Sequence, residues 1–192
     1  ADGLRLAMAV AFTDPKRALS IYDEVGNDLL QVPANPRSRR DGTLALALSS
    51  YPLRRTTRAA EARRGLDSAL SRLREDKLYP ATSIELGSEA DRTLRALADL
   101  EAESGNMQKA IDLYREIVAK TTEAKPEVRL ADATGLSRIY AVLSGLHRRL
   151  GNTAEAAAVE GRRAALWRVW EQKLPGNGFV GRQAAESTCT QG

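Results

Sequence analysis

The chain has 192 residues, of which 43% are hydrophobic and 28% charged, and its net charge is +4. This length suits one sizeable domain or two small ones, and the hydrophobic share is large enough for a packed core. No run approaches the ~20 consecutive apolar residues of a membrane helix, so the sequence excludes a membrane span in this segment. The single cysteine, Cys189, and the single histidine, His147, exclude an intramolecular disulfide and a Cys/His metal site.

Composition favours helices along the whole chain. Aromatic residues make up only 5%, glycine and proline are few, and alanine, leucine, arginine and glutamate dominate. These four residue types are good helix formers. Only residues 44–48 alternate as a strand would, but Leu44, Leu48 and Tyr51 also share one helical face. We therefore predict an all-α fold.

Turn residues divide the sequence into eight expected helices. Their ranges are about 3–12, 15–31, 38–51, 55–76, 83 or 88 to 104, 106–121, 127–150 and 152–173. Asp14 suits the cap of the second helix and Pro15 its first position, whereas Pro52 is expected to close the third. Leu174–Gly178 breaks the eighth helix. The small polar residues 183–192 are then expected to form a flexible tail after a single domain of 1–182.

An internal repeat links three of these helices. The block 105–118 aligns with 151–164, and 14–25 aligns with both. The small residue that the blocks share falls at Ala18, Ala110 and Ala156. The separations of 92 and 46 residues predict a fourth, weaker copy around Ala59. A helix pair of this size needs a stacked neighbour to bury its apolar stripe, and alanine suits the close crossing of such neighbours.

The block Gly-Asn-x-x-x-Ala-Ile-x-x-Tyr at 105–114 resembles the second helix of a tetratricopeptide repeat. Leu94, Leu97 and Ala98 fit the large, large, small pattern of the first helix in that family. Pro126 stands where the family places its terminating proline. The resemblance implies antiparallel helix pairs that stack into a right-handed α-solenoid, with about four pairs in this chain.

This resemblance is clear over 91–126 and 137–167 and partial over 4–33. Two features depart from the family. The period is about 46 rather than the family's 34. In addition, Glu101 stands where the family usually has an aromatic residue. The longer period implies longer helices and a groove geometry that differs from the family's usual one.

Catalytic chemistry has little support in the sequence. The glycines are single helix stops rather than a phosphate-binding loop, and no nucleophile elbow is present. His147 lies on the apolar stripe of its helix, which favours a structural role. Glu101 and Glu103 are interpreted as solvated, and Trp167 and Trp170 as a cap over the terminal core, with an exposed recognition pair as the alternative. We therefore predict no enzyme, no cofactor and no metal.

Arginine is the most informative polar residue. Residues 37–74 contain ten arginines against three acids, Asp41, Glu61 and Asp67, which gives this stretch a charge of +7. Clustered arginine can bind phosphate backbones or acidic partners. It can equally decorate a solvated helix face while its stem covers apolar surface. No aromatic interleaving accompanies the cluster, so nucleic acid is the alternative ligand rather than the first.

The family resemblance implies a non-catalytic protein-interaction scaffold whose concave groove is lined by the first helix of each pair. The outward positions of the fifth and seventh helices are the expected groove residues: Arg92, Arg95, Asp99, Glu103, Arg138, Arg148 and Arg149. These positions are net basic and lack the paired asparagines with which the family clamps a C-terminal carboxylate. We therefore expect an acidic peptide or partner domain, with self-association, polyanion binding through 37–74 and an unrecognised enzyme as alternatives.

The closing block 166–180 is similar to the ends of helical-repeat regions that follow some bacterial serine/threonine kinases. No kinase motif is present, so this similarity implies only the docking or sensing part of a larger signalling protein. The sequence begins Ala-Asp-Gly without methionine, as an excised domain or a processed chain would. A cytoplasmic location is slightly favoured over an extracytoplasmic one.

Overall fold

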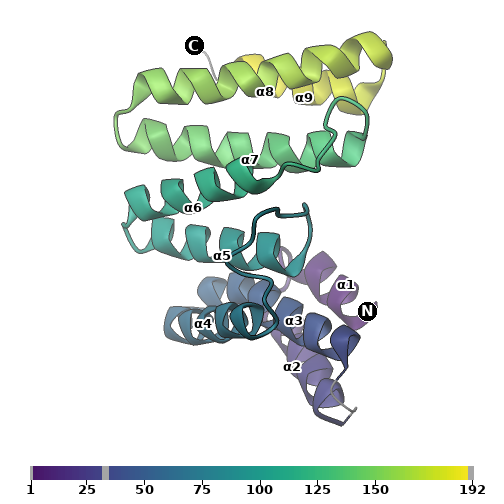
Figure 1. Cartoon of the computed structure of the whole chain (residues 1–192), viewed down its shortest axis with the longest axis vertical. Helices are drawn as coiled ribbons and strands as arrows, with labels where there is room; N and C mark the ends of the chain where they lie inside the picture. Colours follow the sequence, from purple (N-terminus) through teal and green to yellow (C-terminus); the bar gives the residue numbers. More distant parts are fainter. Residues whose placement is uncertain (1, 32–34, 190–192) are drawn as a thin grey trace. The chain divides into compact units, whose positions relative to one another are not determined.

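The computed structural model describes residues 2–31 and 35–189, and every regular element in these ranges is an α-helix (Figure 1). The helices are α1 (Asp2–Val10), α2 (Pro15–Gln31), α3 (Pro36–Arg55), α4 (Ala59–Glu75), α5 (Glu89–Glu103), α6 (Met107–Lys120), α7 (Leu130–Arg149), α8 (Thr153–Lys173) and α9 (Gly178–Cys189). The all-α prediction is confirmed for these ranges. None of the described helices has both the length and the hydropathy that a bilayer crossing requires.

The chain divides into two compact units. The first unit comprises Ala1–Thr82 and Gly87–Ser104 and contains α1 to α5. The second comprises Ser83–Leu86 and Gly105–Gly192 and contains α6 to α9. The division falls between α5 and α6, which the repeat pattern pairs. The repeats of the sequence and the compact units of the structure therefore do not coincide.

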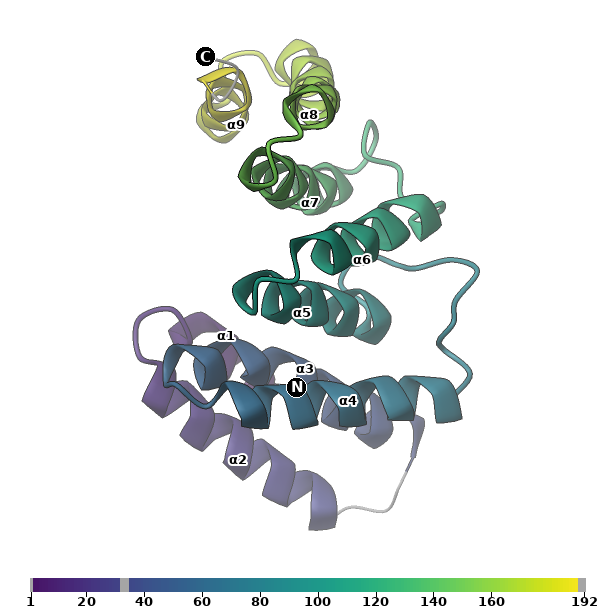
Figure 2. The same ribbon diagram turned by 90° about the vertical axis from the view of Figure 1, so that its left-hand side faces the viewer.

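α3 is the central helix of the first unit. It packs against α1, α2, α4 and α5, while α1 also contacts α2 and α4 contacts α5 (Figure 2). Small side chains dominate the core between α1, α2 and α3. Its buried members are Leu4, Ala7, Ala11, Ala18, Ile21, Tyr22 and Ala45. The repeated Ala18 is 0% exposed, which fits its expected place at a close contact between helices.

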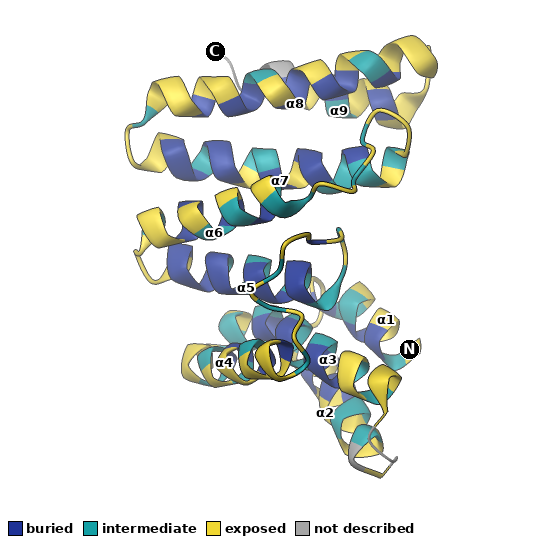
Figure 3. Ribbon diagram, in the orientation of Figure 1, coloured by how far each residue is buried: buried dark blue, intermediate teal, exposed yellow. Residues whose placement is uncertain are grey.

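α7 and α8 form the body of the second unit, with α6 packed on α7 and α9 packed on α8. Buried residues recur along the length of α7 (Figure 3). The other two repeated alanines, Ala110 and Ala156, are 0% and 2% exposed. Segment 83–86 belongs to this unit because the Ile84 N–H donates to the Lys120 carbonyl at 2.7 Å, and the Ile84 side chain is buried.

The recurrent Gly-Asn pair marks one kind of turn. Gly105 and Gly151 have φ angles of 86° and 76°, in the left-handed region that glycine adopts without steric cost. Each ends the turn after a helix, and the next helix begins two residues later. The repeat in the sequence is therefore partly a repeat of this turn.

Two boundaries differ from the prediction. α3 continues through Pro52, because a proline lacks only its own N–H and its carbonyl still accepts the Thr56 N–H at 3.1 Å. The expected tail from residue 183 is helical as far as residue 189. Val180, Ala184 and Ser187 are 1%, 9% and 1% exposed, at spacings of four and three residues that place them on one face of α9. Residues 190–192 lie outside the described ranges.

Candidate functional site

α3 has two accessible faces, and each forms the floor of a groove in the first unit. Leu44 and Leu48 lie four residues apart on one face. Leu46, Ser49 and Leu53 follow each other at spacings of three and four on the other face. Because 3.6 residues complete a helical turn, two such stripes point in different directions from one helix. A helix with two accessible stripes can therefore serve two separate surfaces.

The first groove lies over α1, α3 and the start of α5, and we call it the first-helix groove. Its volume is about 1160 Å³. Its apolar lining includes Leu4, Met8, Leu44, Leu48, Leu73 and Leu78. Leu78 is 46% exposed and Met8, Leu44 and Leu48 are partly exposed, whereas Leu4 and Leu73 are buried. The floor thus offers apolar surface to a ligand.

Arginine surrounds this apolar floor. The lining contains five arginines (Arg5, Arg37, Arg39, Arg40 and Arg92) against three acids (Asp41, Asp76 and Glu89). Two of the acids are already neutralised: Arg39 Nη2 lies 2.5 Å from Asp76, and Arg40 Nε lies 3.3 Å from Glu89. Hydrogen bonding to Asp76 raises the pKa of Arg39 further above its usual range. The groove keeps a net positive charge at its rim after these pairs are counted.

Among the expected groove residues on α5, only Arg92 lines the first-helix groove. Arg95 Nε instead bonds the Asp91 carboxylate at 2.6 Å, and Asp91 is 1% exposed. Asp99 and Glu103 both face Arg54 of α3, at 3.7 Å and 2.8 Å. The side chains of Asp99 and Glu103 are 42% and 57% exposed while they pair with Arg54, and that of Arg95 is 19% exposed.

The three expected residues of α7 belong to the second unit. Arg138, Arg148 and Arg149 are all exposed. Arg148 Nη2 lies 3.5 Å from the carboxylate of Glu160 on α8, so it is directed toward a buried acid. These residues therefore lie on exposed helical surface of the second unit, and one of them is already paired.

One charged residue that the sequence interpretation placed in solvent is buried. Glu101 is 2% exposed, and its carboxylate accepts a hydrogen bond from Arg63 Nη1 at 2.7 Å. The expectation that Glu101 is solvated is therefore wrong. Its spacing of four residues from Leu97 and three from Ala98, on the buried face of α5, is the signal that indicates burial. A buried carboxylate needs a cation within reach, and Arg63 of α4 supplies it.

A larger polar cluster lies between α7 and α8. The Glu160 carboxylate accepts a 2.5 Å hydrogen bond from Ser144 Oγ and lies 3.7 Å from Arg163 Nη1. The Ser137 hydroxyl accepts bonds from Arg163 Nε at 3.1 Å and from Trp167 Nε1 at 2.8 Å. All five side chains are buried. The cluster holds two helices together rather than facing a cavity.

His147 and the tryptophans occupy the interior, as the sequence predicts. His147 is 2% exposed, and Trp167 and Trp170 are 0% and 7% exposed. Burial lowers the pKa of His147, the charge of Arg115 lowers it further, and Glu155 opposes both. Phe179 stands edge-on to Trp167 at 5.9 Å between ring centres. Within the described part of the chain, no cluster of His, Cys, Asp and Glu suits a metal ion.

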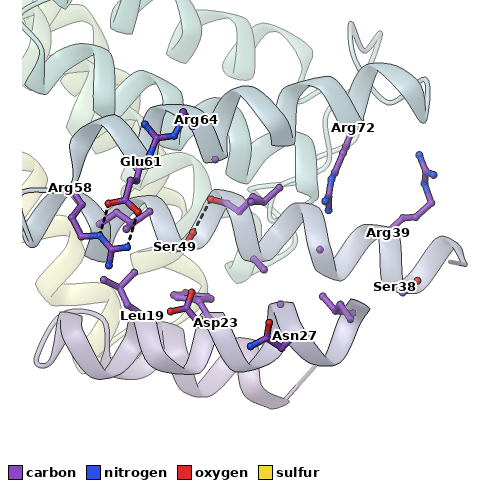
Figure 4. A pocket seen from close by; sticks show the side chains of 18 of the residues that line it. Leu19, Asp23, Asn27, Ser38, Arg39, Ser49, Arg58, Glu61, Arg64 and Arg72 are labelled. Carbon is purple, nitrogen blue, oxygen red and sulfur yellow. Dashed lines mark hydrogen bonds and ion pairs between the residues drawn. The ribbon is translucent and has the colours of Figure 1, made fainter. Parts of the chain in front are cut away.

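The second groove lies between α2 and α4, over the other face of α3, and we call it the arginine groove (Figure 4). Its volume is about 1070 Å³. Near one end, Arg58 bonds both oxygens of Glu61 at 2.7 Å each, which lowers the pKa of that carboxyl. Arg72 reaches from α4 toward α3. Its Nη1 lies only 2.7 Å from where a β-carbon would stand at Gly42, so the absence of a side chain there admits the guanidinium.

Comparison with known proteins adds no relative to these observations. No family model matches the chain, and no curated protein or solved structure matches it. Function is therefore proposed from the geometry of the grooves and from the repeat pattern.

Proposed function

We propose that the chain is a non-catalytic protein-interaction scaffold that binds an acidic peptide, or the acidic face of a partner domain, in the first-helix groove. The observation that carries this proposal is an apolar floor with a basic rim. Leu44 and Leu48 offer apolar contact, while Arg5, Arg37 and Arg92 stand at the rim beyond the paired Arg39 and Arg40. Apolar contact supplies affinity, and opposite charge at the rim supplies association rate and selectivity.

The proposed architecture is a right-handed solenoid of about four helix pairs similar to tetratricopeptide repeats. Support comes from the repeated alanines Ala18, Ala110 and Ala156, all buried, and from the shared glycine turns. Stacked pairs of this kind bury their apolar stripes only against their neighbours and leave one extended surface free for ligands. In this proposal the chain is the docking part of a larger signalling protein.

Polyanion binding through 37–74 is the alternative function. The ten arginines of this stretch favour it. Arg39 and Arg40 are neutralised by Asp76 and Glu89, and Arg58 by Glu61. A uniform polyanion would meet these acids as well as the arginines, so a protein ligand with apolar anchors fits the first-helix groove better.

A binding experiment separates these two functions. Fluorescence anisotropy would compare a labelled peptide rich in glutamate and leucine with a labelled single-stranded oligonucleotide. We expect the peptide to bind and the combined substitutions Arg37→Glu and Arg92→Glu to weaken it about tenfold or more. The matched control, Arg138→Glu with Arg149→Glu, reverses two exposed arginines of the second unit and should leave peptide binding unchanged.

Tighter binding of the oligonucleotide, with an affinity that falls steeply with added salt, would favour the polyanion instead. Equal loss of peptide binding in both double variants would contradict the assignment to the first-helix groove. Melting temperatures of all variants show whether the substitutions alter folding.

A further inference from the structure

We propose that the arginine groove is a second docking site, which accepts an amphipathic helix with one acidic edge and one basic edge. This site lies on a different face of α3 from the first-helix groove and takes a ligand of different charge pattern. The two proposed sites can therefore be tested independently of each other. The occupant follows from the floor of the groove and from the unlike charges of its two walls.

The floor has the length and the chemistry for a helix. From Ser38 to Leu53, α3 contributes a continuous stripe at helical spacing. Its other lining residues are Arg39, Gly42, Ala45, Leu46 and Ser49. Fifteen residues at 1.5 Å each span about 22 Å, which matches roughly four turns of a docked helix. Arg39 at the Ser38 end is the charged member of the stripe and is paired with Asp76. The rest of the stripe is apolar or small, so it suits the apolar face of an amphipathic helix.

The wall made by α4 carries both signs of charge, but its acids Glu61 and Glu75 lie within ion-pair distance of Arg58 and Arg39. Arg64 and Arg72 both line the groove, and neither lies within ion-pair distance of a carboxylate among the described residues. Arg64 acts on Glu61 only through its charge. The two arginines are eight residues apart, which is about 12 Å along a helix. Carboxylates two turns apart on the edge of a docked helix would match both arginines.

The wall made by α2 has the opposite character. Asp23 and Asn27 line it, are exposed and lie one helical turn apart (Figure 4). A lysine or arginine on the second edge of the ligand would face Asp23. A ligand with only acidic edges would meet Asp23, and one with only basic edges would meet Arg64 and Arg72. Like charges brought together across an interface cost affinity, so a mixed pair of edges fits best.

Three synthetic peptides test this site. They share a leucine face and differ at their edges, which are glutamate and lysine, glutamate on both, or lysine on both. Anisotropy of the labelled peptides with the full chain should rank the mixed peptide first. Arg64→Glu with Arg72→Glu should weaken the mixed peptide about tenfold or more and strengthen the all-lysine peptide. This inversion distinguishes charge complementarity from a general loss of the fold.

Arg74→Glu is the matched control, because Arg74 is exposed on the same helix and lines neither groove. It should leave the ranking unchanged, as should Arg37→Glu with Arg92→Glu in the first-helix groove. Equal binding of the three peptides, or no change in Arg64→Glu with Arg72→Glu, would overturn the proposal. Sedimentation of the chain alone completes the test: self-association that this double variant abolishes would show that a second copy is the occupant, and would also overturn it.

Discussion

Arginines in two regions of the chain, the contact between α7 and α8 and the arginine groove, have opposite roles. In the second unit, the side chain of Arg163 is 8% exposed and is enclosed by Ser137, Glu160 and Glu186. In the first unit, Arg64 and Arg72 are exposed at the wall of a groove. An arginine that is surrounded by partners stabilises the fold, whereas an arginine at a rim remains available to a ligand. The contacts around each arginine, rather than the number of arginines, therefore distinguish structure from recognition.

Removal of the central aromatic side chain of the second unit should have the largest effect. Trp167 is 0% exposed, and its indole bonds Ser137 and packs on Phe179. Trp167→Ala should lower the free energy of unfolding by about 3–5 kcal/mol. Trp167→Phe keeps much of the ring and should cost less. Urea unfolding followed by circular dichroism measures both; a negligible loss in Trp167→Ala would show that this core is not continuous.

Substitution of Glu160 tests how much the buried polar cluster between α7 and α8 stabilises the second unit. Glu160→Ala leaves Ser144 and Arg163 without their carboxylate inside the protein and should cost about 3 kcal/mol. Glu160→Gln keeps an acceptor for Ser144 and should cost less. The comparison in the first unit is Glu61→Gln, which removes the charge of an exposed carboxylate and should leave the urea midpoint unchanged. Similar losses at both sites would contradict the contrast between the buried and the exposed carboxylate.

Sequence patterns reveal parts of this structure that depend on local periodicity. Helix positions, the buried alanines and the interior place of Trp167 follow from spacing along the chain. Pairing of Glu101 with Arg63 does not, because the partner lies 38 residues away on another helix. α9 is also missed, since its short stripe of Val180, Ala184 and Ser187 includes only one large apolar residue. Features that depend on a contact with a distant helix do not follow from local spacing along the chain.

In the candidate site, too, some features could be predicted from the sequence and others could not. The arginine content of 37–74 is visible in the sequence, but the separation of its members between two grooves is not. Nothing in the spacing shows that Asp99 and Glu103 turn toward Arg54. Those orientations depend on how α5 packs on α3. Net charge by itself therefore overstates how many groove charges a ligand can use.

The single histidine of the chain, His147, lies in the second unit and should make the stability of the folded state depend on pH. Its pKa is lowered in the folded state, mainly by burial, so the unfolded chain binds the proton more readily. Stability is complete above the ordinary histidine pKa of about 6.5 and falls as the pH drops from there toward the lower folded-state value. Melting temperatures from pH 8 to pH 5 should decline in the wild type and decline less in His147→Gln. Parallel curves would show that other groups control the acid response.

The smallest change is expected for Gly42→Ala, which should raise the stability of the fold and weaken ligand binding. Glycine inside a helix costs roughly 0.5–1 kcal/mol relative to alanine, so Gly42→Ala should raise the free energy of unfolding by up to about that amount. The new β-carbon would also lie 2.7 Å from Nη1 of Arg72, and the flexible end of that side chain must move away. A docked ligand would then lose one of its two cationic partners on α4.

Gly145→Ala is the matched control for this substitution. Gly145 lies in α7, and beyond its chain neighbours and its own helical backbone no described atom lies within 4 Å of where its β-carbon would stand. It should stabilise the chain to a similar extent without touching a groove. We therefore expect both variants to melt higher than the wild type, while only Gly42→Ala binds the mixed-edge peptide more weakly. Because stability and binding move in opposite directions in one variant, weaker binding there cannot be a consequence of a damaged fold. Unchanged peptide binding in Gly42→Ala would show that the position of the Arg72 guanidinium beside Gly42 plays no part in recognition.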